Sequence, residues 1–270
     1  MIYAVLIIIF VFGTMIGSFL NCLIWRLHKK ETILGRSYCP CCRHRIAWYD
    51  NIPILSFIVL RGKCRHCQKL ISWQYPVVEL ITGILFVMSF IINFQFSLQT
   101  GGQAIFYQYP ISGVLSLIKF WFIIAVMIVI FIYDLRWYLI LDIVTLPACV
   151  IVFLINLALG MNWQNLFISG IIGGGFFLLQ FVVSGGRWIG GGDIRLGLLM
   201  GLSLGWPGII SSLTLAYFIG AFIGLGLIAS GKKKLGSKVP MGVFLSVAAI
   251  ITLFWGERIV EWYLGTFLNL

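Results

Sequence analysis

Three long stretches of the sequence contain no lysine or arginine, and these stretches limit the possible folds more than any other feature. They cover residues 70–118, 137–186 and 196–231. A helix needs about 20 mainly apolar residues to cross a bilayer, so each stretch has room for at least one crossing. Of the chain, 61% is hydrophobic and 10% is charged, whereas soluble domains contain roughly 25% charged residues. The sequence therefore excludes a soluble globular protein and a disordered chain, and it predicts an all-α polytopic membrane protein.

The positive charges predict which side of the membrane each connection occupies. The chain has 19 lysines and arginines against 8 acidic residues, and ten of the 19 lie between Arg26 and Lys69. Because basic residues concentrate in cytoplasmic loops, we expect residues 26–76 to be cytoplasmic and both termini to lie outside. The same rule explains the net charge of +11 without nucleic acid as a partner. We expect eight transmembrane helices, at about residues 2–25, 77–96, 113–133, 143–160, 166–184, 194–206 (a short one), 208–230 and 239–255.

The first apolar stretch is expected to be a membrane anchor. Its basic residues follow it and none precedes it, which is the reverse of the order in a cleavable signal peptide. We therefore divide the chain into a first transmembrane helix (1–25), a cytoplasmic insert (26–76) and a transmembrane bundle (77–270). Three further cytoplasmic turns are expected in the bundle, at about residues 134–142, 185–193 and 231–238.

Two CxxC pairs in the insert predict a metal site. Cys39 and Cys42 form the first pair, Cys64 and Cys67 form the second, and 21 residues separate the pairs. Each pair presents two thiolates from one tight turn, and two such turns facing each other form a tetrahedral site of four sulfur ligands. Four protein ligands leave no open position, so we expect one structural zinc ion per chain. Basic neighbours should favour the thiolate form; they are Arg43, Arg45, Lys63 and Arg65.

Other uses of these cysteines are weaker hypotheses. A reducing cytoplasm disfavours disulfides, and the sequence shows no βαβ pattern around the pairs to support a thioredoxin-like redox site. Cys41 competes with its neighbours as a ligand, and His44 or His66 would be able to replace a thiolate. We expect the two histidines to be surface residues.

Three aspartates lie outside the insert, at the predicted cytoplasmic ends of membrane helices: Asp134, Asp142 and Asp193. A charged side chain in a membrane segment costs about 2.5–3.5 kcal/mol on insertion scales, so each is a candidate functional residue. Two carboxylates in contact share one proton, which lets one act as a base on water and the other as an acid. A helix over residues 134–142 would separate its two aspartates by ~12 Å along the axis. This spacing favours a pair that includes Asp193.

The alternative role for these aspartates is to cap helix N-termini. For Asp142 the two roles are equally reasonable, whereas the run Gly190-Gly191-Gly192 before Asp193 favours a sharp turn and close approach of a substrate. The chain has no HExxH motif, no histidine in a predicted membrane helix and no Walker lysine motif, so serine-triad and zinc-hydrolase chemistry have no general base to use. The run Gly173-Gly174-Gly175 lies within a predicted membrane helix, where we expect it to serve helix packing.

Several motifs, in order along the chain, resemble the bacterial prepilin peptidases, also called type IV leader peptidases, which are GxGD membrane aspartyl proteases. The resemblance runs from Gly17 to about Phe244. Besides the zinc insert, its motifs are Gly17-Ser-Phe-Leu-Asn21, Trp25-Arg26-Leu27, Asn51-Ile52-Pro53, Tyr75-Pro76-Val-Val-Glu79, Asp134 with Asp142, Gly190-x-Gly192-Asp193 and Val239-Pro240-Met241-Gly242-Val243-Phe244. The chain departs from the usual family residues at His28, Leu141, Arg195, Met241 and Val243.

For the peptidase, the resemblance implies that Asp134 and Asp193 are the catalytic pair, supported by Gly190, Gly192 and Asp142. The implied substrates are type IV prepilins or pseudopilins, which the family cuts after a glycine at the cytoplasmic face of the bacterial inner membrane. They serve type IV pili and protein secretion.

The family then methylates the new N-terminus with S-adenosylmethionine as the methyl donor. The amine must be neutral to attack the methyl group, so a nearby carboxylate or a desolvated environment would help. Glu79 and Gly62 are our candidate methyltransferase residues. For Glu79 the alternative is an ion pair with a cation of the insert.

Two other functional hypotheses remain. The chain would be a non-enzymatic membrane scaffold for pilus or secretion assembly if its zinc module only docked a cytoplasmic partner. A scaffold does not require aspartates at two helix ends beside a glycine-rich turn. A peptidase that has lost methylation is the other hypothesis, and the intact insert argues against it.

Overall fold

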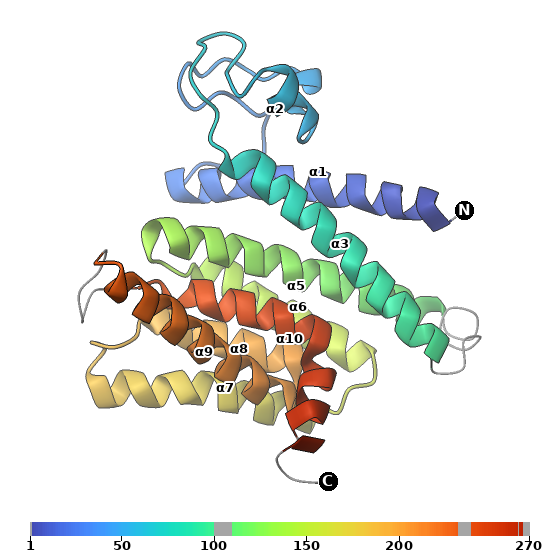
Figure 1. The fold of residues 1–270 in the computed structure, drawn as a ribbon, viewed down its shortest axis with the longest axis vertical. Coiled ribbons are helices and arrows are strands. Elements are labelled where there is room, and N and C mark those ends of the chain that lie inside the picture. The colour runs from blue at the N-terminus through green and yellow to red at the C-terminus, as the bar shows by residue number, and fades with distance from the viewer. Residues whose placement is uncertain (1, 100–109, 232–238, 264, 267–270) are drawn as a thin grey trace. The chain divides into compact units, whose positions relative to one another are not determined.

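The structure is a computed structural model that describes residues 2–99, 110–231, 239–263 and 265–266. The described residues are mostly helical and contain no β-strand beyond two isolated bridges. The chain divides into two compact units, residues 1–100 and residues 101–270, which are coloured from blue to green and from green to red in Figure 1. The predicted all-α fold is confirmed.

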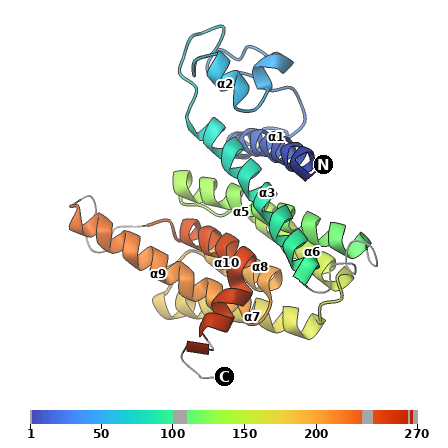
Figure 2. The same ribbon diagram turned by 45° about the vertical axis from the view of Figure 1, so that its right-hand side comes forward.

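The first unit consists of two long helices and the cysteine-containing insert between them. Its elements are α1 (Ile2–Lys29), the 3-10 helix η1 (Trp48–Asn51), α2 (Leu55–Val59) and α3 (Gln74–Gln99). Figures 1 and 2 both show α3 crossing α1. The two helices approach closely at glycines: a Cβ on Gly13 would lie 2.8 Å from the Cα of Gly83, and a Cβ on Gly17 would lie 2.8 Å from the Cα of Glu79. Small residues allow this kind of close contact between membrane helices.

The second unit is a bundle of six helices among the described residues. They are α5 (Pro110–Trp137), α6 (Asp142–Ala158), α7 (Trp163–Ser184), α8 (Gly191–Leu204), α9 (Gly208–Ala229) and α10 (Met241–Tyr263). The helix α8 packs against α6, α7 and α10, and its residues Leu196 and Met200 are completely buried. Other side chains in this core are Met127, Phe177, Ile209 and Leu245.

The backbones of α7 and α8 are in contact. A Cβ on Gly173 would lie 2.2 Å from the carbonyl oxygen of Gly197, and a Cβ on Gly201 would lie 2.1 Å from the carbonyl oxygen of Ser169. No side chain fits into these contacts. The packing role predicted for the glycine run of α7 is therefore confirmed at Gly173, and this packing fixes the position of the helix that begins near Asp193.

Each of the eight predicted membrane segments corresponds to a helix. Among the described residues, six of these helices are long and apolar enough to cross a membrane, and two are shorter. These six are α1, α3, α5, α7, α9 and α10. The other two, α6 and α8, have 17 and 14 residues, against the roughly 20 that a crossing needs. Most residues of α8 are buried inside the bundle, whereas α6 exposes large apolar side chains such as Leu146, Val150 and Leu154. Composition alone does not distinguish burial in protein from contact with lipid.

Several helices also extend past the predicted ends of the apolar stretches. The first continues to Lys29, the second begins at Gln74, and the last reaches Tyr263, so that Arg258 lies within a helix. Composition marks where the apolar surface ends, whereas the backbone hydrogen bonds continue into the polar region. The predicted turn at 231–238 lies outside the described residues except for Gly231.

Candidate functional site

The four cysteines of the CxxC pairs lie in two turns with the same hydrogen-bond pattern. In the first turn the N–H of Cys39 donates to the carbonyl of His44 at 2.9 Å, and in the second the N–H of Cys64 donates to Lys69 at 2.9 Å. The residue after each pair, Arg43 or Gln68, has a positive φ. Local backbone geometry thus aims both sulfurs of each pair to one side of its turn.

The two turns bring four sulfur atoms together. The Sγ atoms of Cys39, Cys42, Cys64 and Cys67 all lie within 4.8 Å of one another. Those of Cys39 and Cys67 are 3.9 Å apart, close to the ~3.8 Å that a tetrahedron with zinc–sulfur bonds of about 2.3 Å requires. The donor set and its spacing therefore fit zinc. Cys41 is exposed and is not a member of this group.

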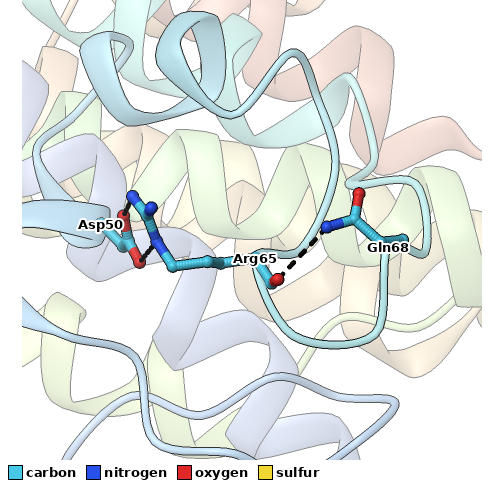
Figure 3. Close-up of polar contacts among 3 residues, drawn as sticks. All are labelled: Asp50, Arg65 and Gln68. Atoms are coloured by element: carbon cyan, nitrogen blue, oxygen red, sulfur yellow. Dashed lines mark hydrogen bonds and ion pairs between the residues drawn. The ribbon is translucent and has the colours of Figure 1, made fainter.

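The histidines and arginines of the insert have other contacts. The rings of His44 and His66 lie against each other, with their centroids 3.4 Å apart and their planes tilted by 35°. Neither histidine belongs to the group of four ligands. Arg65 lies between two ligands in the sequence, and its guanidinium binds both carboxylate oxygens of Asp50 at 2.6 and 2.8 Å (Figure 3). Gln68 donates to the carbonyl of Arg65 at 3.2 Å in the same turn. The ion pair between Arg65 and Asp50 therefore joins the second cysteine turn to η1.

Backbone hydrogen bonds also prepare a ligand for metal binding. A hydrogen bond from the backbone of Cys67 outweighs the effect of burial and lowers the pKa of the Cys64 thiol to about 7. The ion pair acts in the same direction on Asp50, because the hydrogen bonds from Arg65 hold the pKa of that carboxyl below its usual value. At neutral pH the Asp50 carboxyl is therefore ionised, and about half of the Cys64 thiol is in the thiolate form.

Arg26 joins the insert to the end of α1. It is 4% exposed, and its guanidinium donates to four backbone carbonyls in the loop that follows, those of Thr32, Ile33, Gly35 and Arg36. From the sequence, Arg26 was expected only to mark the cytoplasmic side of the membrane and to belong to a family motif. Its position directly after an apolar run and before a glycine-containing loop is the signal that would have indicated this role.

Glu79 and Gly62 are connected to the two ends of α2: Glu79, in α3, binds the residue before α2, and Gly62 follows α2 in the sequence. The Glu79 carboxylate is 6% exposed and accepts a 2.8 Å hydrogen bond from the N–H of Ile54, directly before α2. Gly62 has a φ of +67° and donates to the carbonyl of Phe57 at 2.8 Å. The insert therefore binds Glu79 through a backbone amide. The ion pair with a cation of the insert, which was the alternative role for this residue, is not among the ion pairs of the described residues.

Asp134 lies in the last turn of α5 and is 5% exposed. Its Oδ2 accepts a hydrogen bond of 3.1 Å from the backbone N–H of Val243, in the first turn of α10. A Cβ on Gly242 would lie 2.8 Å from the same oxygen. The start of α10 therefore approaches this carboxylate with its backbone, which requires a residue without a side chain at Gly242.

Asp193 lies in the first turn of α8 and is 8% exposed. Its Oδ2 accepts a 2.9 Å hydrogen bond from the N–H of Gly190, the residue that precedes the helix. The carboxylate thus also caps α8, so the capping role and a chemical role coexist in one residue. A Cβ on Gly192 would lie 2.8 Å from the Cβ of Ile140, and this glycine therefore permits close contact with the chain between α5 and α6.

Ile140 connects the surroundings of the two carboxylates. Its side chain contacts Gly192 next to Asp193, and its Cδ1 would lie 3.1 Å from a Cβ on Gly242 beside Asp134. The helix α10 packs against both α5 and α8, and the two carboxylates are close enough to interact electrostatically. The bundle therefore gathers Asp134, Asp193, Gly190 and Gly192 in one region. The sequence offered no signal for Ile140.

Asp142 belongs to a different environment. It is the first residue of α6, its side chain is 50% exposed, and it forms an ion pair with Arg195, which lies two residues after Asp193. The N-cap of α6 is Leu141, so Asp142 does not occupy the capping position. Asp142 therefore contacts the helix that carries Asp193 and is not a member of the buried pair.

These features define a multi-pass helical membrane protein with a buried pair of aspartates in its bundle and a four-thiol site in an insert. Residues 11–93 match the Bacterial Peptidase A24 N-terminal domain, and residues 121–225 match the Type IV leader peptidase family. The chain belongs to the type IV leader peptidase family.

Three relatives, each named prepilin leader peptidase/N-methyltransferase, align over nearly the whole chain. The protein from Aeromonas hydrophila is 32% identical over 97% of this chain and 94% of its own length. The Legionella pneumophila protein is 29% identical, over 94% and 92%, and that of Bacillus subtilis is 29% identical, over 95% and 97%. No solved structure matches the chain.

Proposed function

We propose that the protein is a membrane aspartyl peptidase that removes the leader of type IV prepilins or pseudopilins after a glycine and then methylates the new N-terminus. Family membership and the names of the full-length relatives support both activities. One structural observation carries the assignment of the peptidase site. Asp134 and Asp193, from helices far apart in the sequence, are both buried, and the glycines beside them, Gly242 and Gly192, both approach Ile140.

In the proposed hydrolysis, one carboxylate removes a proton from a water molecule, whose oxygen attacks the carbonyl carbon of the glycine. The second carboxyl group donates a proton to the nitrogen that leaves when the carbon–nitrogen bond breaks. Each of the two aspartates has one carboxylate oxygen bound by a backbone N–H, from Val243 or Gly190. These two hydrogen bonds fix the orientation of the carboxylates, and this supports their use as a preorganised pair.

In the proposed methyl transfer, the free amine attacks the methyl carbon of S-adenosylmethionine, the carbon–sulfur bond breaks, and a proton leaves the nitrogen. We assign supporting roles to Glu79 and Gly62 because they hold the two ends of the α2 segment. A zinc ion bound by Cys39, Cys42, Cys64 and Cys67 would hold the insert in shape, since four protein ligands leave no position for a substrate. Glu79 additionally offers a buried acceptor.

For the location of both reactions, we propose the cytoplasmic face of the bacterial inner membrane. The positive-inside rule supports this orientation, because the basic insert follows α1 and the two aspartates lie at helix ends that border predicted cytoplasmic turns. The substrate of such an enzyme combines a basic leader with an apolar helix that starts just after the cut. Labelling of single introduced sites from either side of intact cells would test this orientation.

The decisive experiment incubates the purified full-length protein in detergent with a prepilin and measures the products by mass spectrometry, with and without S-adenosylmethionine. We expect a cleaved product in both cases and an additional mass of one methyl group only when S-adenosylmethionine is present. Failure of the folded protein to cleave any prepilin or pseudopilin would favour the non-enzymatic scaffold. Cleavage without methylation would favour a peptidase that has lost its second activity.

Two variants then separate the assignments of the residues. Glu79→Gln should give a cleaved but unmethylated product, whereas Asp193→Asn should give neither. Methylation should return when Asp193→Asn is supplied with a pilin that has already been cleaved. If a folded Asp193→Asn protein fails to methylate that substrate, the assignment of the two activities to separate residues is wrong.

A further inference from the structure

The insert was expected to be entirely cytoplasmic, yet the short helix α2 presents an apolar face that no described part of the first unit covers. Leu55, Ile58 and Val59 are 60%, 64% and 73% exposed. Their spacing of three and four residues puts them on one face of the helix. For comparison, Ile7 and Ile8 on the membrane helix α1 are 64% and 67% exposed.

The contacts of this segment place it at the depth of the membrane helices. The hydrogen bond from Ile54 to Glu79 connects the residue before α2 to α3. At this level α3 packs on Gly17 of α1, because a Cβ there would lie 2.8 Å from the Cα of Glu79. Gly17 is nine residues before Arg26, which is about 14 Å along the axis of α1.

The distance of about 14 Å between Gly17 and Arg26 along α1 is larger than the reach of the Glu79 side chain. Since Glu79 lies level with Gly17 and binds the residue before α2, α2 begins on the apolar side of Arg26. The stretch of α1 between the two positions contains no charged residue. Figure 1 agrees with this placement, since α2 lies over the length of α1 and not beyond the end opposite the N-terminus.

The backbone before α2 is held in an unusual conformation. Ile54 has a φ of +62° and a ψ of −51°, and the N–H of Leu55 donates to the carbonyl of Pro53 at 2.6 Å. This is a γ-turn of the rare, strained kind. Such strain persists where the surroundings fix the backbone, and the buried carboxylate of Glu79 provides one of these constraints.

The residues around the apolar face are those typical of a membrane interface. Trp48 and Trp73 are 74% and 72% exposed, and Trp73 directly precedes α3. Exposed Arg61 and Lys63 follow α2 within four residues. Tryptophan is enriched at the headgroup level of bilayers, and basic residues beside a membrane-surface helix bind anionic headgroups.

We infer that α2 is embedded in the boundary between headgroups and acyl chains of the bilayer, with Leu55, Ile58 and Val59 in contact with lipid. The insert is then attached to the membrane at three places, namely the end of α1, the start of α3 and α2. This attachment keeps the four-cysteine module at the membrane surface, and it does not depend on the proposed enzymatic function.

A spin-labelling experiment on the full-length protein tests this inference. An amino acid with a ketone group replaces Ile58, and a ketone-reactive nitroxide labels it, so that all native cysteines remain. The protein is placed in bilayers that contain anionic lipid, and collisions of the nitroxide with oxygen and with a water-soluble nickel chelate are measured. Labels at Ile8 of α1 and at Arg45, an exposed residue of the first cysteine turn, serve as the lipid and water references.

We expect the label at Ile58 to collide with oxygen in preference to the nickel chelate, as the label at Ile8 does. Nickel accessibility equal to that at Arg45 would show that α2 is in water and would overturn the inference. Low accessibility to both reagents would also overturn it, because a protein surface and not lipid would then cover α2. If the Ile58 variant does not retain its zinc and its fold, the same measurement at Val59 decides the question.

Discussion

The four-cysteine site and the aspartate site differ in the sequence distance over which each is assembled. Each cysteine turn is closed by hydrogen bonds between residues no more than five positions apart, as from Cys39 to His44 and from Cys64 to Lys69. The carboxylate of Asp134, in contrast, is bound by the backbone of Val243, 109 positions later. Local turns specify the first site, whereas the packing of whole helices specifies the second.

This contrast teaches that the two sites should fail for different reasons. Neither η1 nor α2 has a buried residue, so the order of the insert depends on metal binding in addition to its anchors on α1 and α3. The aspartate site needs no metal for its geometry, but it requires that α5, α8 and α10 keep their positions. Each prediction below perturbs one of the two units and states which property should change and which should not.

The largest effect is expected from loss of the zinc ligands. Because zinc binding supplies folding free energy in small metal modules, on the order of 10 kcal/mol, Cys64→Ser should release the metal and make the insert sensitive to protease. The variant Cys41→Ser, which changes an exposed cysteine outside the group of four, should retain one zinc per chain. Metal analysis and limited proteolysis measure both results.

Leader cleavage by the Cys64→Ser protein should persist, whereas methylation should fall. The assignment of a zinc site would be wrong if carefully purified wild-type protein contained no zinc. Equal loss of cleavage and methylation would show that the insert and the bundle are not independent.

The second effect concerns catalysis. Asp134→Asn and Asp193→Asn should each lower the cleavage rate by at least about 10²–10⁴-fold, the usual contribution of a positioned general acid or base. Both proteins should retain their zinc and their thermal midpoint to within a few degrees. Asp142→Asn is the matched control, and its effect should be much smaller because Asp142 is half-exposed and paired with Arg195. An equal loss at Asp142 would require a different catalytic pair.

A smaller effect should follow from a change in helix packing. In Gly173→Ala the new Cβ would meet the backbone of Gly197 at 2.2 Å, so α8 has to move, at a cost of ~1–3 kcal/mol typical of overpacked sites. We expect a lower thermal midpoint and slower cleavage with unchanged zinc content.

The control for this change is the neighbouring glycine. In Gly175→Ala, the nearest atom to the new Cβ is the Cγ2 of Ile171 on the same helix, at 4.0 Å. This variant should behave like the wild type. If the two alanine variants destabilise the protein equally, the contact between the backbones of α7 and α8 does not determine the position of α8.

The same contrast explains what was predictable from the sequence. The CxxC spacing was sufficient to predict the group of four sulfurs, because both turns are local. Helix spacing favoured an aspartate pair that includes Asp193, and the family resemblance named Asp134 as its partner. Ile140 and Gly242 belong to the site only through tertiary packing, which no sequence periodicity encodes. Eight membrane segments were predicted and six helices have the length and composition of a crossing. The helix α8 is apolar because many of its residues are buried in the bundle, and residues buried in protein have the same composition as residues in lipid. The helix α2 has only five residues and lies in a basic segment, so no sequence signal indicated its proposed contact with lipid.

The smallest expected effect is that of the ion pair between Arg65 and Asp50, and its pH dependence distinguishes it from metal binding. Arg65 lowers the pKa of Asp50 below the value of about 3.9 that an unfolded chain has. A lowered carboxyl pKa gives stability that is present above the unfolded pKa and is lost only as the pH falls through the folded one. The destabilisation in Asp50→Asn should therefore be the same at pH 5.5 and pH 8. It should not exceed ~1 kcal/mol, because the Arg65 side chain is 49% exposed, and concentrated salt should reduce it further.

Zinc affinity should instead fall between pH 8 and pH 5.5, because protons compete with the metal for the thiolates. Thermal unfolding of the zinc-loaded wild type and variant at both pH values measures the first quantity, and competition with a chelator measures the second. A variant effect that disappeared at pH 5.5 would mean that the Asp50 carboxylate titrates in this range, contrary to its contacts with Arg65.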